Sequence, residues 1–219
     1  MVKAVIFDLD GTLVDSAPDI QASVNVMLEE EGLGPLDLPT TIQFIGNGLP
    51  TLVERVMAAR NIEEVEFDRI HARVLAIYNA SNSDKSVVYD GVLDTLKYLQ
   101  EQGLTLAVCT NKPVEPARHV LDGLGLAGFF EAVIGGDSLS VRKPDPKPLL
   151  AAMGDVQKSD VLYVGDSEVD ADTASNAGVT FALFTEGYRK SAVAEISHDV
   201  AFSHWSELLD AAGLRRSAG

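Results

Sequence analysis

The sequence has a single cysteine, Cys109, and only four histidines among its 219 residues. One cysteine cannot form an internal disulfide, and Cys109 ends an apolar stretch that starts at Leu104, which favours a buried strand residue over a nucleophile. No cluster of histidine and cysteine points to zinc. No apolar run approaches the roughly 20 residues of a membrane helix. We therefore expect neither a disulfide framework nor a membrane partner.

Basic residues are also scarce: 17 Lys and Arg stand against 33 Asp and Glu, which gives a net charge of -16. Nucleic acids and anionic membranes repel so negative a protein, and neither is expected as a partner. A phosphorylated substrate would need local positive charge or a metal ion. The sequence opens on a strand pattern rather than a cleavable leader, so we expect a cytoplasmic protein. We expect it to be a monomer or a homodimer.

Short apolar runs alternate with helical patterns from Leu93 onward, which is typical of a parallel, doubly wound α/β sheet. After an opening strand that ends at Phe7, the predicted strands are Leu104–Cys109, Ala132–Gly135, Val161–Val164, Thr180–Phe184 and a short one near Val200. The helices between them are predicted at 93–102, 115–124, 146–153 and 170–177, with a last one ending near Ala212. An apolar content of 46% can supply the core of such a domain.

Residues 16–84 contain helical patterns and no strand-like alternation. Ser16 to Asp19 has the form of a capping box, and we predict a helix from there to about Glu31. Further helices are predicted at Leu49–Arg60 and Glu66–Tyr78, before a polar return at Ser81–Asp84. We thus expect an α/β core domain of residues 1–15 and 85–219 and a helical domain of residues 16–84 inserted after the first strand.

Asp8 and Asp10 follow the opening strand directly. Ligands of open α/β sheets bind beyond the carboxyl ends of the strands, so this is a position for chemistry. Two like charges so close repel each other unless a cation, a shared proton or a base compensates. A solvated acidic turn is the plainer alternative.

Three further groups of polar residues follow predicted strands. Thr110, Asn111 and Lys112 offer donors suited to phosphate oxygens, although an ordinary turn would look the same. Lys143 lies in a turn stiffened by two prolines, which would hold it in one place unless the loop is simply solvated. Asp166 and neighbouring acids precede a helix, where an N-cap is the alternative.

Together these groups are more specific than any one of them. Asp8, Asp10 and Asp166 offer the hard oxygen ligands that Mg²⁺ prefers. Thr110 and Lys143 offer a donor and a positive charge to a phosphate group held against that ion.

The motifs D-L-D-G-T, T-N-K, K-P-D-P and G-D-S-E-V-D, in this order and over nearly the whole chain, resemble those of the haloacid dehalogenase superfamily. The helical insert resembles the four-helix cap found in that superfamily. The stretches Phe44–Gly48, Thr110–Pro113 and Gly135–Ser138 further resemble its phosphoglycolate phosphatase branch. The resemblance implies a Mg²⁺-dependent phosphomonoester hydrolase with 2-phosphoglycolate as the expected substrate.

The resemblance also implies catalytic roles for four residues. Asp8 would be the nucleophile that takes the phosphoryl group. Asp10 would protonate the leaving alkoxide and then activate water. Thr110 and Lys143 would hold the phosphate. These roles agree with covalent catalysis in which positive charge lets a carboxylate approach a phosphate dianion.

The same resemblance implies a metal site and a substrate site. Asp166 would bind Mg²⁺ together with Asp8 and the backbone carbonyl of Asp10, and Asp170 would support the metal's water shell or Lys143. Substrate contacts would come from Gly46, Asn47, Gly48, Asn111 and Lys112. A substrate carboxylate could also meet one of the cap arginines or His71, and the sequence does not decide which: the arginines are Arg55, Arg60, Arg69 and Arg73.

Single residues distinguish the other functions that occur in this superfamily. A dehalogenase needs no acid at the place of Asp10, and a phosphonate hydrolase needs a cap lysine, whereas residues 16–84 contain none. A regulatory module on an inactive scaffold would be expected to lack Asp8 or Asp10. A phosphatase for another small phosphomonoester or sugar phosphate, or a β-phosphoglucomutase-like phosphotransferase, remains the alternative.

Overall fold

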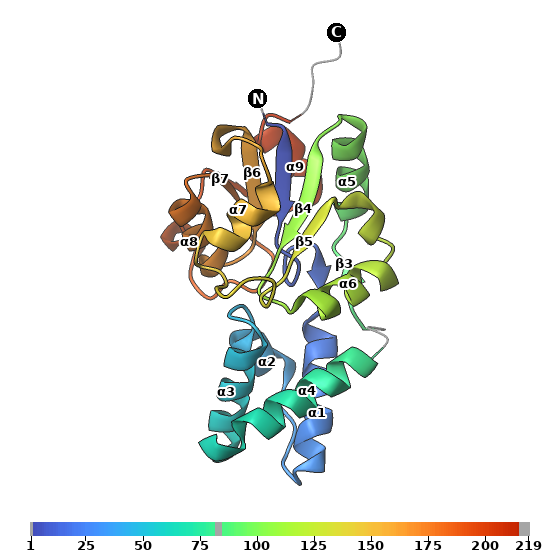
Figure 1. The fold of residues 1–219 in the computed structure, drawn as a ribbon, viewed down its shortest axis with the longest axis vertical. Helices are drawn as coiled ribbons and strands as arrows, with labels where there is room; N and C mark the ends of the chain where they lie inside the picture. Colours follow the sequence, from blue (N-terminus) through green and yellow to red (C-terminus); the bar gives the residue numbers. More distant parts are fainter. Residues whose placement is uncertain (1, 82–84, 215–219) are drawn as a thin grey trace.

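The computed structural model describes residues 2–81 and 85–214, and shows an α/β lobe and a helical lobe joined end to end (Figure 1). The predicted polar return at 81–84 and the tail at 215–219 lie, apart from Ser81, outside the described residues. The N-terminus lies at the end of the α/β lobe that points away from the helical lobe.

Six parallel strands form the sheet of the α/β lobe in the order β5-β4-β1-β6-β7-β8. Their bounds are β1 Ala4–Phe7, β4 Thr105–Cys109, β5 Ala132–Ile134, β6 Val161–Gly165, β7 Thr180–Phe184 and β8 Val200–Phe202. The predicted α/β class with a doubly wound parallel sheet is therefore confirmed. Because β1 lies between β4 and β6, the polar residues that follow these three strands come together at one edge.

Helices cover both faces of the sheet (Figure 1). They are α5 Val92–Glu101, α6 Val114–Gly123 and α9 Trp205–Ala211 against one face, and α7 Lys147–Met153 and α8 Glu168–Ala177 against the other. Strand β1 shows why both faces must be covered. Val5 and Phe7 belong to one buried cluster and Ala4 and Ile6 to the other, all fully buried. Apolar residues at every position leave neither face suited to water.

The helical lobe consists of α1 Ala17–Glu30, α2 Leu38–Phe44, α3 Leu49–Arg60 and α4 Phe67–Ala80. Its own buried cluster includes Met27, Val53 and Ile70. The predicted bounds of α3 are confirmed. Helix α2 was not predicted, because seven residues span only two turns and show too little periodicity to be recognised. Asp37 begins it by accepting a hydrogen bond from the Thr40 amide at 2.8 Å.

The capping box predicted at Ser16 is wrong. Ser16 precedes α1, but its hydroxyl makes no capping hydrogen bond and donates instead to Asp10 Oδ1 at 2.5 Å. Asp19 accepts hydrogen bonds from the Lys85 amide and from Ser86 Oγ at 2.5 Å. Contacts with distant residues thus replace the local bonds that the motif indicated.

Two short strands connect the lobes. β2 Val14–Asp15 and β3 Val87–Val88 pair antiparallel, so the two crossings of the chain between the lobes lie side by side. Two-residue strands carry no sequence pattern, and neither was predicted. Short 3₁₀ turns complete the described structure at Glu64–Glu66, Ala127–Phe129, Lys158–Asp160 and Val193–Glu195. None of the helices in the described residues is long and apolar enough to cross a membrane.

Candidate active site

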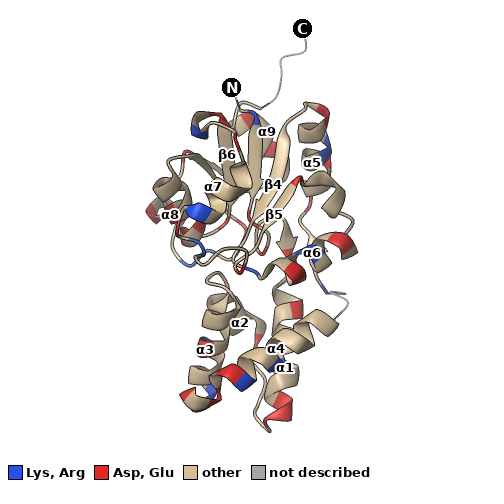
Figure 2. Ribbon diagram, viewed as in Figure 1, with Lys and Arg blue, Asp and Glu red and all other residues tan. Residues whose placement is uncertain are grey.

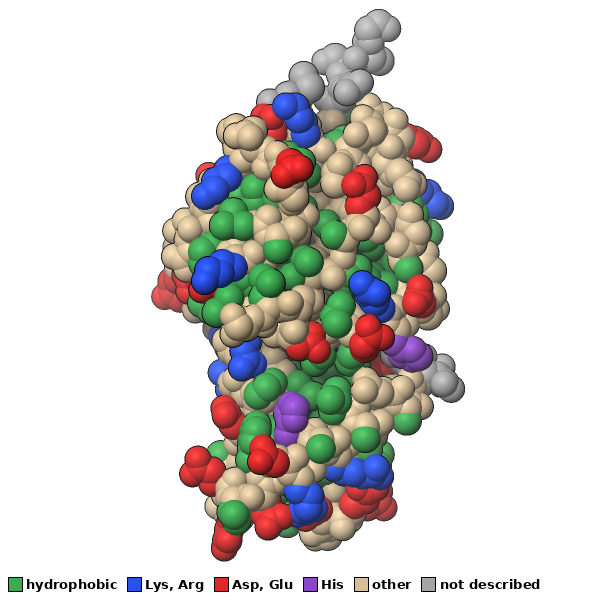
Figure 3. Space-filling model, in the orientation of Figure 1, with side chains coloured by type: hydrophobic (Ala, Val, Ile, Leu, Met, Phe, Trp, Pro, Cys, Tyr) green, Lys and Arg blue, Asp and Glu red, His purple; other side chains and the backbone are tan. Residues whose placement is uncertain are grey.

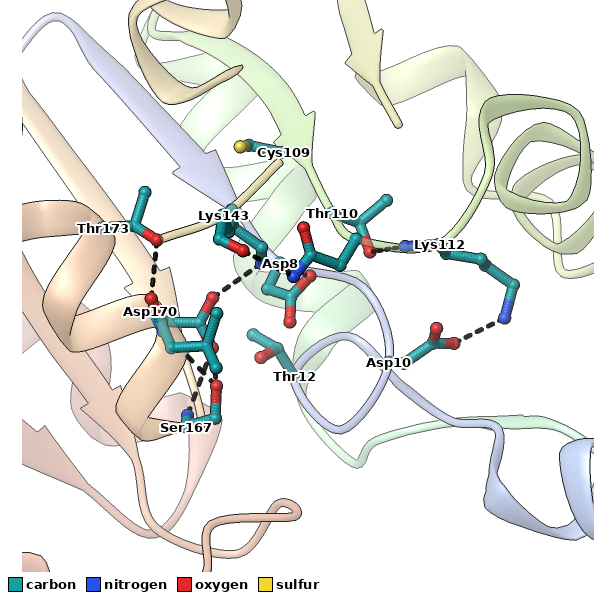
Figure 4. A network of polar contacts seen from close by, with 12 residues as sticks. Asp8, Asp10, Thr12, Cys109, Thr110, Lys112, Lys143, Ser167, Asp170 and Thr173 are labelled. Atoms are coloured by element: carbon teal, nitrogen blue, oxygen red, sulfur yellow. Dashed lines mark hydrogen bonds and ion pairs between the residues drawn. The ribbon is translucent and has the colours of Figure 1, made fainter. Parts of the chain in front are cut away.

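The predicted polar residues meet at the carboxyl edge of the sheet, facing the helical lobe (Figure 4). Asp8 follows β1 directly, and its amide donates to the Val164 carbonyl at 2.9 Å. Thr110 follows β4, and its amide donates to the Ile134 carbonyl at 2.9 Å. Ladder hydrogen bonds therefore fix the backbone of both residues. Figure 2 shows Lys and Arg in the loops on this side of the α/β lobe, although the chain is acidic overall.

Three carboxylates lie together in this site. One oxygen each from Asp8, Asp166 and Asp170 falls within 4.8 Å of the other two, and all three residues are buried. Burial raises the pKa of Asp8 to about 7, with the Asp170 charge adding to the rise. Burial and the charges of Asp170 and Asp8 likewise raise the pKa of Asp166 well above its usual value. An all-oxygen set short of positive charge fits a hard divalent cation such as Mg²⁺.

Asp166 is held from two sides. Its Oδ1 accepts from Thr12 Oγ1 at 2.7 Å, and its Oδ2 accepts from the Tyr188 amide at 2.6 Å. The loop carrying Tyr188 approaches so closely that a Cβ on Gly187 would lie 2.3 Å from the Gly11 carbonyl oxygen and 2.4 Å from Asp166 Cβ. Glycine at position 187 is therefore required by the packing around this carboxylate.

Lys143 is the cation of the carboxylate cluster. Its Nζ lies 2.9 Å from Asp8 Oδ1, 2.7 Å from Asp170 Oδ1 and 2.9 Å from Tyr163 Oη. Tyr163 and Asp170 accept hydrogen bonds from this ammonium, and Asp8 is its ion-pair partner, so its position is fixed from three sides. Burial lowers the pKa of Lys143, but the charges of Asp170 and Asp8 outweigh it and hold the pKa above its usual value.

Asp170 joins this cation to the start of α8. Burial alone would raise its pKa, but Lys143 and hydrogen bonds from Ser167 and Tyr163 bring the pKa below its usual value. Its Oδ2 accepts from the Ser167 amide at 3.1 Å, and the Ser167 hydroxyl caps the Asp170 amide in return. The helix N-cap that the sequence offered as an alternative at this motif is therefore present, and Asp170 forms the ion pair with Lys143 as well.

Asp10 lies apart from Asp8 and Asp170 and points towards Lys112 (Figure 4). Its Oδ1 accepts from Lys112 Nζ at 2.7 Å and from Ser16 Oγ at 2.5 Å. Burial lowers the pKa of Lys112, but Asp10 and Tyr78 together outweigh burial and hold this pKa above its usual value. The two aspartates of the opening motif, one residue apart, therefore have different partners and different surroundings.

Comparison with known proteins agrees with this geometry. Residues 5–184 match the family model described as haloacid dehalogenase-like hydrolase. The chain belongs to this family. The match covers both lobes and every residue of the cluster described above.

Several relatives of this haloacid dehalogenase-like hydrolase are named phosphoglycolate phosphatase. The chain is 50% identical to a phosphoglycolate phosphatase of Cereibacter sphaeroides, over 95% of this chain and 97% of the relative. It is 40% identical to a phosphoglycolate phosphatase of Rhodospirillum rubrum, over 100% and 94%. A crystal structure of a predicted phosphoglycolate phosphatase from Haemophilus somnus has a TM-score of 0.89 at 32% identity, over 95% of this chain and 97% of that one.

A cavity in this haloacid dehalogenase-like hydrolase lies between the two lobes, and Figure 3 shows a hollow there with hydrophobic side chains around it. Asp8, Asp10, Thr110, Asn111 and Lys112 line its core side. The helical lobe contributes Gly46 and Gly48 and a largely apolar wall: Ile20, Ile45, Leu49, Leu52, Val74 and Leu75. The site thus pairs a polar floor with an apolar roof.

Asn47, which the resemblance implied as a substrate contact, does not line this cavity. Its Oδ1 accepts from Arg55 Nη2 at 3.0 Å, so its side chain is occupied within the helical lobe. Asn111 lines the cavity, and its Nδ2 donates to the Gly46 carbonyl at 3.2 Å and to the Lys143 carbonyl at 3.1 Å. Asn111 therefore joins the loop Gly46–Gly48 to the phosphate-side loops.

The cap arginines and His71 lie outside the cavity. Arg69 pairs with Glu31 and Glu66, and Arg73 pairs with Glu30, all in the helical lobe. Arg60 donates to the Gly34 and Pro35 carbonyls, Arg55 to the Phe44 carbonyl, and His71 stacks on Phe67 at 5.5 Å. None of these five side chains therefore lines the cavity, and each has a partner within the helical lobe.

Three residues of the site were missed by the sequence reasoning. Tyr163 contacts Lys143 from β6, and a tyrosine in an otherwise aliphatic buried strand could have signalled a polar partner. Tyr188 accepts from the Ser16 and Ala17 amides at 2.8 and 2.9 Å and donates to Asp15 Oδ1 at 2.6 Å. Ser16 and Tyr188 carried no signal, because their partners are distant in sequence or lie across an unpredicted turn.

Proposed function

We propose that this protein is a phosphomonoester hydrolase that acts through an aspartyl-phosphate on Asp8, with 2-phosphoglycolate as its substrate. The observation that carries the proposal is the position of Asp8 at the floor of a cavity, in ion contact with Lys143 and beside two further carboxylates. Membership of the hydrolase family and the names of the relatives support it.

In the proposed first step, a carboxylate oxygen of Asp8 attacks phosphorus and the bond to the leaving oxygen breaks. Asp10 gives that oxygen a proton. In the second step water attacks phosphorus, Asp10 takes its proton, and the bond to Asp8 breaks to release phosphate. Thr110, which lines the cavity, and Lys143, which contacts Asp8, would hold the phosphate oxygens, because a hydroxyl and an ammonium are suited to them.

A magnesium ion in this site would be held by the carboxylates of Asp8 and Asp166 and the backbone carbonyl of Asp10, with Asp170 beside it. When bound, it would supply positive charge that offsets the repulsion between carboxylate and phosphate. The fit rests on the three carboxylates that meet in a buried place, where burial raises the pKa of Asp8 and of Asp166 and a bound cation would favour their charged forms.

We further propose that residues 16–84 form a cap domain and that residues 1–15 and 85–219 form the core domain. The paired strands β2 and β3 would be the hinge, and closure of the cap would exclude water from the phosphate. Cytoplasmic location and a monomeric or homodimeric state remain predictions from the sequence.

The alternative is a β-phosphoglucomutase-like phosphotransferase. The apolar roof argues against it, because a hexose would bring several hydroxyl groups against Leu49, Leu52 and Val74 with few partners for them. A small leaving group leaves fewer polar groups unpaired.

The proposal is tested by phosphate release from a panel of small phosphomonoesters. With Mg²⁺, 2-phosphoglycolate should have the highest kcat/KM. EDTA should abolish the activity and added Mg²⁺ should restore it, while Ca²⁺ should inhibit because its larger, looser coordination would occupy both oxygens of Asp8. Full activity in metal-free buffer, faster turnover of hexose phosphates, or isomerisation of β-glucose 1-phosphate instead of hydrolysis would count against it.

A further inference from the structure

Lys112 is the only cation among the described residues that line the cavity under the apolar roof. It is 7% exposed. Its Nζ donates to Asp10 Oδ1, and it also interacts with the Tyr78 side chain, which together with Asp10 raises the pKa of Lys112. Lys143, by contrast, donates to Asp170 and Tyr163 and has Asp8 as a further ion-pair partner. An ammonium has three donors, so Lys112 has a donor left for an anionic group of a ligand.

Tyr78 of α4 covers Lys112 from the helical lobe. The Lys112 ammonium lies 4.6 Å from the centre of the Tyr78 ring, over its face. Tyr78 lines the cavity and is 6% exposed, and its hydroxyl donates to no acceptor among the described residues, because its neighbour Lys112 can only donate. A buried hydroxyl whose proton has no acceptor costs free energy, so this group is suited to an acceptor on a ligand.

The hydroxyl also lies in a charged environment. Burial raises the pKa of Tyr78, and Lys112 is the nearby charge that opposes the rise most strongly. Tyr78 therefore keeps its proton and can donate it to an acceptor. The other hydroxyl on the cap side of the cavity, that of Ser23, already donates to the Asp19 carbonyl at 3.0 Å. A negatively charged acceptor between Tyr78 and Lys112 would satisfy both residues.

We propose that Tyr78 Oη and Lys112 Nζ form a binding site for a carboxylate on the leaving group of the substrate. This site makes Tyr78 the cap residue that selects phosphomonoesters of short hydroxy acids. The inference rests on the proposed phosphatase function and deepens it. It replaces the expected cap arginine, because the four arginines lie outside the cavity and are bound to carboxylates, carbonyls or Asn47 of the helical lobe.

The test compares two substrates of similar size, 2-phosphoglycolate and 2-hydroxyethyl phosphate, which differ in the carboxylate. The measured quantity is the ratio of their kcat/KM values. Tyr78→Phe keeps the ring over Lys112 and removes only the hydroxyl, so the ratio should fall about tenfold or more, as expected for one hydrogen bond to a charged group. Lys112→Gln should lower the ratio further. Arg73→Gln, a matched change on the same helix but outside the cavity, should leave the ratio as in the wild type.

A second measurement uses free glycolate as an inhibitor of p-nitrophenyl phosphate hydrolysis. Its inhibition constant should rise about tenfold in Tyr78→Phe. An unchanged substrate ratio, or unchanged glycolate inhibition, in a variant that keeps the wild-type melting temperature overturns the carboxylate site and leaves the phosphatase proposal standing. Failure of the wild type to release phosphate from any of the three esters would instead overturn the proposed function, and the site with it.

Discussion

At the scale of single residues, Asp8 and Asp10 show how neighbours in sequence come to have different chemistry. Asp8 lies in a buried cluster with two other carboxylates and with Lys143. Asp10 lies on the cap side and is bound by Lys112 and Ser16. A carboxylate such as Asp8, packed against a lysine and other carboxylates, is suited to act as a nucleophile. A carboxylate such as Asp10, which lines the cavity on its other side, is suited to transfer a proton.

Asp8→Asn and Asp10→Asn should separate these roles. Asp8→Asn should abolish turnover of every phosphomonoester while the fold survives, because an amide is nearly isosteric with the carboxylate but cannot act as the nucleophile. Asp10→Asn should slow phosphorylation of the enzyme by an alkyl phosphate much more than by a nitrophenyl phosphate, whose leaving group needs no proton. Single-turnover measurements on both substrates provide the comparison.

Equal losses on the two substrates in Asp10→Asn would argue against an acid role for Asp10. Asp172→Asn is a matched control, because Asp172 lies on α8 outside both the cluster and the cavity. It should retain wild-type activity on both substrates.

At the scale of elements, Tyr188 of the α/β lobe makes several contacts at the junction between the lobes. Its hydroxyl accepts from the amides of Ser16, just before α1, and of Ala17, and donates to Asp15, while the Tyr188 amide donates to Asp166. The start of the first helix of the helical lobe and a carboxylate of the proposed metal site thus contact the same residue. A change at this junction should therefore alter both the stability of the protein and the position of Asp166 in the site.

Tyr188→Phe should destabilise the protein by about 2 kcal/mol, because it leaves two buried amides and Asp15 without their partner. For a chain of this size that corresponds to a fall of several degrees in the melting temperature. Thermal unfolding followed by circular dichroism measures it. A melting temperature of Tyr188→Phe equal to that of the wild type would contradict this role of Tyr188.

At the scale of the whole molecule, charge is the dominant feature. A chain with a net charge of -16 places its buried lysines, Lys112 and Lys143, at the edge of the sheet where we propose that phosphate binds. A phosphate dianion bound there would meet local positive charge within a repulsive overall field. The proposed metal ion would add positive charge at the carboxylate cluster and would thereby stabilise the folded chain.

Stability in EDTA should therefore depend on pH in a way that Mg²⁺ removes. In the metal-free protein the pKa of Asp8 is raised to about 7, from about 4 when unfolded, so between these pH values the folded state binds more protons. The contribution of Asp8 to the free energy of unfolding then falls as pH rises from about 4 to about 7. Melting temperatures in EDTA should decrease over this window, and less steeply in Asp8→Asn.

Saturating Mg²⁺ should raise the melting temperature near pH 7 and flatten this dependence, since an ion that binds only the folded state stabilises it. If the melting temperature in EDTA changes with pH equally in the wild type and in Asp8→Asn, the pH dependence comes from the overall charge of the protein and not from the carboxylate cluster.

The sequence by itself determined the parallel sheet, the helical insert and the positions of the polar residues at strand ends. These follow from local rules, because hydrophobic periodicity sets where strands end, and parallel strands end at a common edge. Asp8, Thr110 and Asp166 could be placed together for this reason. Helix α2 and the strands β2 and β3 are too short to carry such periodicity.

Only the tertiary structure decided the partners across the site. Tyr188 reaches Ser16 across 172 positions, and Lys112 reaches Asp10 across 102. The arginines of the helical lobe pair with acids of neighbouring helices, as Arg73 does with Glu30. Which side chain enters the cavity depends on how the four helices pack against one another, and a pattern along one helix does not contain that information. For this reason Tyr78, and not an arginine, faces Lys112.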